Sequence, residues 1–403
     1  MNEYIPWSDA AFQTQEEYLL VETPSASFRI GIPKERTMDE HRVLLTPDTV
    51  QLLVQQGHEI LVEAQAGQLA GFTDKMYADA GAQLVRQPRE IYQCNLVCKV
   101  APPTEEEISW MTGHQTLISA LQLRTRNRTY FKALADKKVT ALALEEVRNG
   151  DDQSALRIAM SEIAGQMAAR VGASLLAEGA HGPGKGKLMG PIPGVAPAQV
   201  VVIGAGTAGL SAVRAAQGMG ASVVLMDPNI NRLRYAQDVI NNTLVTEVIQ
   251  DVALLRRIGE ADVLIGALAP VNGRTPVVVT EDMIAAMAPN SVVIDISIDH
   301  GGCIETSELT SHHQPTRKVL DVIHYAIPNM ASAVGHTASI AMSNFVGPML
   351  RSMADAGGVE DCLHYHLNTR AGLYMYGGLI TKRHLGEHFD LPFSNDNLLF
   401  GNL

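Results

Sequence analysis

The 403-residue chain has few cysteines, and their spacing excludes several kinds of site. Cys94, Cys98, Cys303 and Cys362 form neither a disulfide framework nor a C-x-x-C metal pair. Two of them accompany an apolar stretch, where free cysteine behaves as a small hydrophobe. The sequence "CLHYH" at Cys362 lacks a second ligand pair at the usual spacing for zinc. We therefore predict no disulfide and no bound metal.

Positive charge and long apolar runs are also scarce. Lysine and arginine number 31 against 43 acidic residues, which gives a net charge of −12 and argues against a nucleic-acid partner. No run of eighteen apolar residues is present, so we expect no membrane span. The start "MNEYIPWSDAAFQTQEEYLL" lacks the basic and apolar regions of a secretion signal. These absences predict a cytoplasmic protein.

What is present is a regular alternation of strands and helices. "FRIGIP" and "HEILVEA" are typical of strands, and between them "TPDTVQLLVQQG" predicts a helix that begins at Thr46-Pro47 and ends at Gly57. The alternation continues through "NLVCKV", "QTLISAL" and "TALALE". Repeated β-α-β units predict a parallel sheet that is covered on both faces.

The length favours two domains, because it exceeds what one hydrophobic core usually supports. A long helix is expected at "SEIAGQMAARVGASLLAEGA", a second β-α series from Gln199 to about Pro328, and another helix at "ASIAMSNFVGPMLRSMADAG". We predict an α/β fold of two doubly wound Rossmann-like domains with parallel sheets, joined by long helices. The expected division is an extension at 1–27, one domain from 28–155 plus 334–403, and a second at 156–333.

The stretch "QVVVIGAGTAGLSAVRAAQGMGASVVLMD" is the most specific signal in the chain. An apolar strand runs into Gly204, Gly206 and Gly209, then a helix, and then a second strand that ends at Asp227. Such glycines allow a tight turn, close approach of a pyrophosphate and close helix packing, and the helix N-terminus faces the phosphates. A carboxylate at Asp227 favours NAD over NADP, although Arg232 and Arg234 lie nearby and complicate that choice.

Two later strands, in "ADVLIGALAP" and "SVVIDISIDHGG", end near Ala267-Leu268 and Asp299. Ligands of open parallel sheets lie beyond the carboxyl ends of the strands, so we expect Asp299 near the nicotinamide. A buried salt bridge or a cap is the alternative role for Asp299. Asp295, earlier in the same strand, is expected to be structural.

These motifs together resemble a known family. "RIGIPKE", "EHRVLLTPD", "AGAQLV", "MSEIAG", "LMGPIPGV", "VVVIGAGTAG" and "IDISIDHGGCIETSE" are similar to the alanine dehydrogenase and NAD(P) transhydrogenase alpha-subunit family, and closer to alanine dehydrogenase. The resemblance covers roughly Phe28 to the C-terminus. It implies a substrate domain built from both chain ends, a central NAD domain and a homo-oligomer, commonly a hexamer. It also implies NAD-dependent interconversion of an L-amino acid, alanine first, with its 2-oxo acid (pyruvate), ammonia and NADH.

The resemblance also assigns residues. Arg42 matches the arginine that holds the substrate carboxylate, a task that suits bidentate Arg–carboxylate geometry, unless it is a surface arginine beside Glu40. Ser161 matches a serine near the cofactor phosphates, or is a helix N-cap. Glu145 matches a strand-end acid near the substrate pocket, or is structural. The remaining cofactor positions are, on the adenosine side, Gly204, Gly206, Gly209, Asp227 and Arg232, and, around the nicotinamide, Ala267, Leu268, Asp299, Asn329 and Met330.

Two positions depart from the family pattern. The family strand Lys-Val-Lys-Glu-Pro corresponds to Lys99-Val100-Ala101-Pro102-Pro103, so Ala101 replaces the substrate-binding lysine. The family histidine of Leu-His-Leu is replaced by Gln122, which cannot exchange a proton near neutral pH. Lys99 shares a strand face with Ala101, and Arg124 with Gln122, so either could compensate or serve only packing and surface pairing. The candidate catalytic residues are Arg42, Lys99, Gln122 and Asp299.

Three functional hypotheses remain open from the sequence. The first is an NAD-dependent dehydrogenase of the alanine dehydrogenase type. The second is the same fold acting on another oxo or imino acid, and the third is an NAD-binding regulator without turnover. A transhydrogenase subunit is weaker, because "DQSALRIAMSE" preserves little of that subunit's loop and the chain lacks membrane helices.

Overall fold

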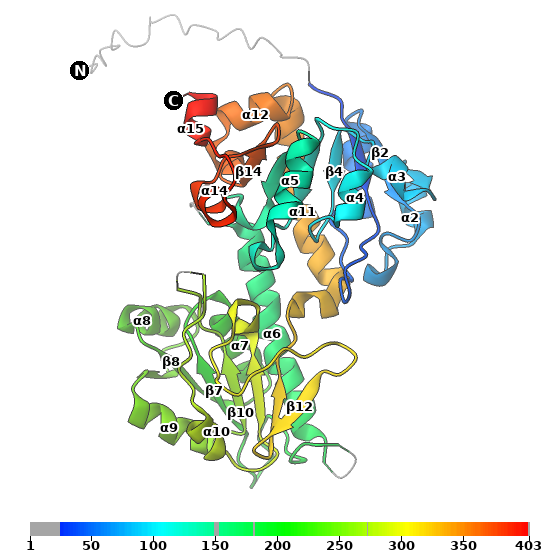
Figure 1. The fold of residues 1–403 in the computed structure, drawn as a ribbon. Helices are drawn as coiled ribbons and strands as arrows, with labels where there is room; N and C mark the ends of the chain where they lie inside the picture. The colour runs from blue at the N-terminus through cyan, green and yellow to red at the C-terminus, as the bar shows by residue number, and fades with distance from the viewer. Residues whose placement is uncertain (1–24, 149–152, 180–181, 272, 402–403) are drawn as a thin grey trace, which may run out of the picture.

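The structure, a computed structural model, describes residues 25–148, 153–179, 182–271 and 273–401, so the expected extension at 1–27 lies almost wholly outside the described residues. Figure 1 shows two lobes, with helix α6 (Ala155–Ala177) running from the first lobe into the second. The chain returns to the first lobe through helix α11 (Gly335–Asp355), which packs against α6.

The first lobe holds an eight-stranded sheet in the order β15-β14-β6-β5-β4-β1-β2-β3. The strands are β1 Arg29–Ile32, β2 Glu59–Glu63, β3 Gln83–Val85, β4 Leu96–Cys98, β5 Thr116–Ser119, β6 Thr140–Ala143, β14 Leu373–Tyr376 and β15 Leu379–Ile380. The helices are α1 Pro47–Gln55, α2 Asp74–Asp79, α3 Pro88–Ile91, α4 Glu105–Ser109, α5 Arg128–Asp136, α12 Val359–Tyr365, α13 Leu367–Arg370, α14 Arg383–Phe389 and α15 Asp396–Phe400.

The second lobe holds a seven-stranded sheet in the order β12-β13-β11-β10-β7-β8-β9. The strands are β7 Gln199–Ile203, β8 Ser222–Asp227, β9 Val245–Val248, β10 Val263–Gly266, β11 Val292–Asp295, β12 Thr316–Val319 and β13 Val322–Tyr325. The helices are α7 Thr207–Gly218, α8 Ile230–Val239, α9 Asp251–Glu260 and α10 Glu281–Ala285. No helix among the described residues is long and apolar enough to cross a membrane.

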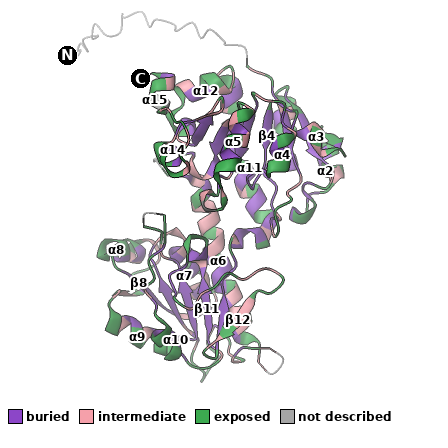
Figure 2. Cartoon of the chain, viewed as in Figure 1, coloured by how far each residue is buried: buried purple, intermediate pink, exposed green. Residues whose placement is uncertain are grey.

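Each sheet is buried on both faces, as its apolar strands require. In β4, Leu96 and Cys98 join one core cluster, while Val97 between them joins the cluster on the opposite face. In β7, Val200 and Val202 face one cluster, and Val201 faces the other. Side chains that alternate between two apolar layers explain why these strands read as continuous hydrophobic runs. Figure 2 shows the buried strands at the centre of both lobes.

The predicted α/β fold with two parallel sheets is confirmed at the centre of each sheet, whereas the edges differ. β14 pairs antiparallel with β6 and β15, and β12 pairs antiparallel with β13. The β14–β15 hairpin turns at Gly377 and Gly378, whose φ angles are 55° and 88°. Such left-handed glycine pairs favour a tight hairpin, so the turn could have been read from the sequence.

The long linking helix also begins earlier than expected. We predicted a start near Ser161, but α6 begins at Ala155, and Ser154 Oγ accepts the N–H of Arg157 at 3.3 Å. Ser154 is therefore the N-cap, and the alternative role of Ser161 as an N-cap is wrong. Ser161 lies in the second turn of α6.

The strand orders identify where ligands are expected. In the first sheet the strand order reverses between β1 and β4, and in the second between β7 and β10; we call these places the first-lobe and second-lobe switch points. Loops that leave the carboxyl ends of two such strands diverge to opposite faces and open a crevice between them. The segments after β1 and β4, and those after β7 and β10, contain most of the predicted site residues.

Candidate active site

The glycine loop after β7 has the shape of a phosphate cradle. Gly204 has a φ of 108°, a conformation that favours glycine, and a Cβ there would lie 2.5 Å from the Ala267 carbonyl oxygen. A Cβ on Gly209 would collide with the Gly204 carbonyl. At Gly206, the N-cap of α7, an added Cβ would meet no atom within 4 Å. Nothing in the described protein requires a glycine at this position, whereas the backbone N–H groups of α7 open toward the same space and suit a pyrophosphate.

The side-chain carboxylate of Asp227 holds the glycine loop in place. It ends β8, is fully buried, and its carboxylate accepts the N–H groups of Ala205 and Asn229, both at 2.8 Å. We predicted Asp227 on the adenosine side of the cofactor. Its two oxygens accept backbone N–H groups, and the carboxylate therefore also clamps the glycine loop against the adjoining strand end. Arg232 lies exposed on α8.

The nicotinamide-side residues gather beyond β10 and β11. Ala267 lies against Gly204, and the next carbonyl, that of Leu268, accepts the hydroxyl of Ser297 at 3.0 Å. Asp299 belongs to a 3₁₀ turn, Ile296–His300, and its two oxygens accept the Asn329 N–H at 3.1 and 3.3 Å.

Asn329 and Met330 form a corner at the start of the next 3₁₀ turn. Asn329 has a φ of 56° and caps Met330–Val334, and Met330 is buried. Left-handed backbone is better tolerated by asparagine than by most residues. Asn329 therefore presents its N–H to one side and its side-chain amide to the other.

Arg42 is held rigidly in the first lobe. Its Nε donates to Glu40 Oε1 at 2.7 Å and its Nη2 to Oε2 at 2.5 Å, a bidentate pair that is almost fully buried. Burial alone would raise the pKa of Glu40, but the charge and hydrogen bonds of Arg42 outweigh it and lower that pKa. Met160 Sδ of α6 lies 3.5 Å from Nη1.

Glu40 and Asn329 join the two lobes. The side-chain amide of Asn329 donates to Glu40 Oε2 at 3.0 Å, although the two residues are 289 positions apart. A continuous chain therefore runs from Asp299 through Asn329 and Glu40 to Arg42. The surrounding protein desolvates the Asp299 carboxyl group and raises its pKa, and the Asn329 N–H and the Arg42 charge oppose this shift. The Asp299 residue is nevertheless exposed at the surface.

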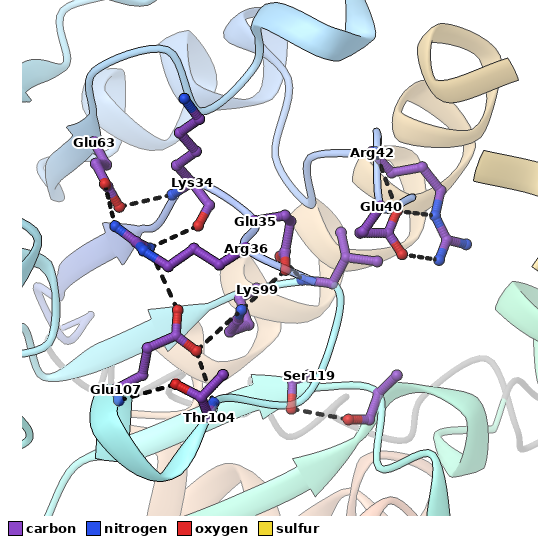
Figure 3. A network of polar contacts seen from close by, with 12 residues as sticks. Lys34, Glu35, Arg36, Glu40, Arg42, Glu63, Lys99, Thr104, Glu107 and Ser119 are labelled. Carbon is purple, nitrogen blue, oxygen red and sulfur yellow. Dashed lines mark hydrogen bonds and ion pairs between the residues drawn. The ribbon is translucent and has the colours of Figure 1, made fainter. Parts of the chain in front are cut away.

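Lys99 is fully buried and is committed to other protein groups. Its Nζ lies 2.9 Å from Glu35 Oε2 and 3.5 Å from Glu107 Oε2 (Figure 3). Glu35 Oε1 also accepts the Val100 N–H at 2.6 Å, which ties the β1 loop to the β4 loop at the switch point. Burial would lower the pKa of Lys99, but Glu35 and Glu107 outweigh it and raise the pKa.

The same cluster extends to Arg36 and Glu63. Arg36 Nη2 lies 2.5 Å from Glu63 Oε1, and its Nη1 lies 3.3 Å from Glu107 Oε1. Thr104 and Glu107 form a capping box at the start of α4. Burial raises the pKa of Glu35; for Glu107 the same effect is outweighed by Lys99, and its pKa is lowered.

The two altered positions have different surroundings. Ala101, after β4, is fully buried. Gln122, after β5, is exposed and adopts a left-handed backbone with φ 46° and ψ 53°. Glu145 Oε1 accepts the N–H groups of Leu121 at 2.9 Å and Gln122 at 3.2 Å. The side chain of Arg124 lies outside the described part of the structure.

Comparisons with known proteins agree with this architecture. The family profile described as Alanine dehydrogenase/PNT, N-terminal domain, matches residues 31–164, and the C-terminal domain profile matches 168–383. Alanine dehydrogenase of Mycolicibacterium smegmatis is 38% identical over 367 residues, covering 91% of this chain and 98% of that relative. Alanine dehydrogenase of Bacillus subtilis is 39% identical over 353 residues, covering 87% and 92%.

The chain belongs to the alanine dehydrogenase/PNT family.

Solved structures of this family have the same fold. An L-alanine dehydrogenase superposes with a TM-score of 0.85 at 34% identity, covering 90% of this chain and 99% of the other. The transhydrogenase from Sinorhizobium meliloti gives a TM-score of 0.74 at 25% identity, covering 88% and 98%. The predicted family resemblance is therefore confirmed.

Within this alanine dehydrogenase/PNT fold, hydrogen bonds connect some predicted residues and leave others apart. Arg42, Asp299 and Asn329 belong to one network, and Ala267 lies against Gly204 of the cofactor loop. Lys99 belongs to a separate cluster. Gln122 is fixed by Glu145, and Ser161 and Arg232 lie on their helices without a contact described to either network.

Sequence reasoning named Glu40 only as the neighbour of a surface arginine, whereas the structure buries the Glu40–Arg42 pair. Other residues that hold the candidates in place were missed. The pattern Thr104-x-x-Glu107 is a capping-box signature and could have been recognised. Glu35 had no comparable signal, because its partner Lys99 is 64 residues away.

Proposed function

We propose that the protein is an NAD-dependent amino-acid dehydrogenase that interconverts an L-amino acid with its 2-oxo acid, ammonia and NADH. Alanine and pyruvate are the first substrate pair to test. The observation that supports this most strongly is the hydrogen-bonded chain from Arg42 to Asp299. It links Arg42, to which we assign the substrate carboxylate, to the edge of the other lobe that carries the glycine cradle.

We assign each residue around the site a role from its position. Glu40 occupies the Nε–Nη2 edge of Arg42, and Met160 Sδ lies 3.5 Å from Nη1, so we assign the substrate carboxylate to the Nη1 side, next to Met160. The cradle Gly204–Gly209 would hold NAD, which supplies a hydride acceptor for the substrate Cα. Gln122 is suited to hydrogen-bond the reacting nitrogen or oxygen but not to exchange its proton.

Asp299 is the group best suited to proton exchange at this edge. Desolvation raises the pKa of Asp299, while the Asn329 N–H and the Arg42 charge oppose that shift, and a carboxyl group is a common general acid or base. Its hydrogen bonds to the Asn329 N–H fix the carboxylate plane. In this proposal Asp299 orients a water or relays the proton that the family histidine would otherwise carry.

A second candidate is the same chemistry on a different oxo or imino acid. It is favoured by one observation: Ala101 removes a cation from the substrate side, and Lys99 does not replace it, because its ammonium is buried against Glu35 and Glu107. A site with one cation fewer binds a pyruvate-like carboxylate less strongly. An altered substrate would account for both changed positions.

Turnover assays at 340 nm distinguish these candidates. Purified protein is mixed with NAD and a panel of L-amino acids at alkaline pH, and with NADH, ammonium and a panel of 2-oxo acids near neutral pH. Turnover of alanine and pyruvate supports the first candidate. Activity on another pair with pyruvate silent supports the second. NADH binding without any turnover contradicts both and leaves a regulatory protein.

Restoring the family groups gives a sharper version of this test. In the variant Ala101→Lys with Gln122→His, general acid–base capacity returns, and such groups typically contribute about a hundred- to ten-thousandfold in rate. We expect alanine turnover to rise well above that of the unmodified protein if the native site is specialised for another substrate. A fall in alanine turnover would show that the present residues already serve it.

We also propose that the enzyme acts in the cytoplasm as a homo-oligomer, with a hexamer expected from the family resemblance. The acidic net charge of −12 and the small-molecule substrates are consistent with this setting. Sedimentation velocity of the full chain tests the assembly, and a monomer at micromolar concentration would contradict it.

A further inference from the structure

Gln122 adopts a backbone conformation that glutamine rarely takes. Its φ of 46° and ψ of 53° lie in the left-handed region, where a Cβ crowds the neighbouring peptide. Such residues persist only where the surroundings hold them, and they concentrate at functional sites. Gln122 is also exposed, three residues after the end of β5 at the carboxyl edge of the first sheet. What holds this residue is therefore part of the site.

Hydrogen bonds hold the backbone of Gln122 on both sides. Its N–H and that of Leu121 donate to Oε1 of Glu145, at 3.2 and 2.9 Å, and the Leu121 N–H also lies 3.2 Å from Oε2. The Gln122 carbonyl accepts the N–H and the hydroxyl of Thr125, both at 2.9 Å. These hydrogen bonds fix the backbone of Gln122 and, with it, the direction in which the side chain leaves the chain.

Glu145 is well placed for this task because it follows β6, the strand beside β5. Burial raises the pKa of Glu145, and the N–H groups of Leu121 and Gln122 oppose that shift. The two N–H groups therefore favour the ionised carboxylate. Burial also raises the pKa of the adjacent Glu146, but there the opposing groups are the charges of Lys382, Arg157 and Arg148.

We infer that Glu145 is a positioning residue, which holds the loop after β5 in the left-handed conformation that presents the Gln122 amide to the substrate. This inference rests on the proposed dehydrogenase function, and it assigns Glu145 no direct contact with substrate. In place of a titrating histidine, the site would use a neutral amide whose orientation is set by a carboxylate behind it. Activity should then depend on the geometry of Glu145 more than on its charge.

Two substitutions separate geometry from charge. Glu145→Gln keeps an Oε1 acceptor for both N–H groups, whereas Glu145→Ala removes it. The assay uses the substrate pair for which turnover is observed at 340 nm. We expect Glu145→Ala to lower kcat by at least about tenfold, because displacing a substrate-contacting group by about 1 Å can lower the rate about a hundredfold. We expect Glu145→Gln to retain most of kcat with an unchanged pH profile. Glu146→Gln is the matched control and should leave kcat near that of the unmodified protein.

A double-mutant cycle with Gln122→Gly tests whether Glu145 acts through Gln122. Glycine adopts the left-handed conformation without help and has no amide to present. Glu145→Ala should therefore cost less than about twofold in kcat in the Gln122→Gly background. Additive losses would overturn the inference, because Glu145 would then act independently of Gln122. A kcat for Glu145→Gln as low as that for Glu145→Ala, or a shifted pH profile, would likewise overturn it and indicate a proton carrier.

Amide hydrogen exchange provides a readout that does not need turnover. Leu121 and Gln122 should exchange at least about tenfold faster in Glu145→Ala than in the unmodified protein, while protection in β5 stays the same. If no substrate is turned over but these two amides lose protection, the proposed function fails and the positioning role stands. Unchanged protection at Leu121 and Gln122 would overturn the positioning role.

Discussion

The two switch points of this protein are built alike but filled differently. At the second-lobe switch point, Gly206 leaves open space beside the backbone N–H groups that begin α7, and the carboxylate of Asp227 clamps the loop. At the first-lobe switch point, the loops after β1 and β4 are joined by ionised side chains, Lys99 with Glu35 and Glu107. A cradle made of backbone tolerates little change in sequence, whereas a site made of side chains can be altered one residue at a time.

This difference explains where the chain departs from its family pattern. Both altered positions, Ala101 and Gln122, lie in the first lobe, after β4 and β5, where we propose that side chains bind the substrate. The glycine cradle in the second lobe keeps Gly204, Gly206 and Gly209 at the predicted positions of the motif. The comparison predicts that substitutions in the first lobe change stability and substrate choice, and that substitutions in the cradle change cofactor binding.

The largest effect is expected from Lys99→Met. The substitution removes the cation between Glu35 and Glu107 and leaves two carboxylates buried with less compensation, which typically costs about 3 to 5 kcal/mol. We expect the free energy of unfolding, measured by urea denaturation, to fall by about that amount. KM for the active substrate should change little in the protein that remains folded.

Neutralising the partner provides the control for this prediction. Adding Glu35→Gln to Lys99→Met removes one of the uncompensated charges and should recover part of the lost stability. A large increase in KM with normal stability would instead show that Lys99 reaches the substrate and compensates for Ala101.

The cofactor loop of the second lobe could be predicted from the sequence. The side-chain contacts of the first lobe could not, because the residues that make them are far apart in the chain. The glycine loop and the strand ends could be predicted because a single β-α-β unit of local sequence specifies them. The role of Lys99 could not be predicted, because an apolar strand with one lysine is consistent with both a substrate ligand and a buried ion pair. Only the fold brings Glu35 next to Lys99, and only the fold brings Asn329 across to Glu40. The left-handed backbone of Gln122 depends in the same way on Glu145.

A smaller effect distinguishes the buried carboxylates Asp295 and Glu40 by the sign of their pH dependence. Burial raises the pKa of Asp295 from 3.8 to about 6. The folded state then binds this proton more tightly than the unfolded state, so the contribution of Asp295 to stability is present below about pH 4 and is lost as the pH rises through 6. At 1.36 kcal/mol per pKa unit, this loss is at most about 3 kcal/mol.

Glu40 has the opposite sign, because its pKa lies below the ordinary value of 4.5. Its stabilising contribution is present above pH 4.5 and is lost as the pH falls through the folded-state pKa. Urea denaturation at a series of pH values should therefore show Asp295→Asn gaining relative to the unmodified protein between pH 4 and 6. Glu40→Gln should lose stability relative to the unmodified protein as the pH rises toward 4.5 and should show no further relative change above it. Parallel pH profiles for the two variants would contradict this assignment.

The smallest change tests the cradle with a single methyl group. Because a Cβ at Gly206 would meet no protein atom within 4 Å, Gly206→Ala should leave the thermal midpoint nearly unchanged. If the space belongs to a pyrophosphate, the same methyl group obstructs the approach of the phosphates to the α7 N–H groups. We expect the Kd for NADH, measured by fluorescence titration, to rise by at least about tenfold, since close contact with the backbone N–H groups supplies much of the binding.

Two other glycines of the same helix bracket this result. Gly218, at the far end of α7, also has open space around its Cβ position, so Gly218→Ala should change neither stability nor NADH affinity. Gly209→Ala should destabilise the fold, because its Cβ would collide with the Gly204 carbonyl. Normal NADH affinity in Gly206→Ala would show that the cofactor does not lie over this glycine. That result would contradict the contrast between the two switch points, because the second-lobe site would no longer be a backbone cradle for the cofactor.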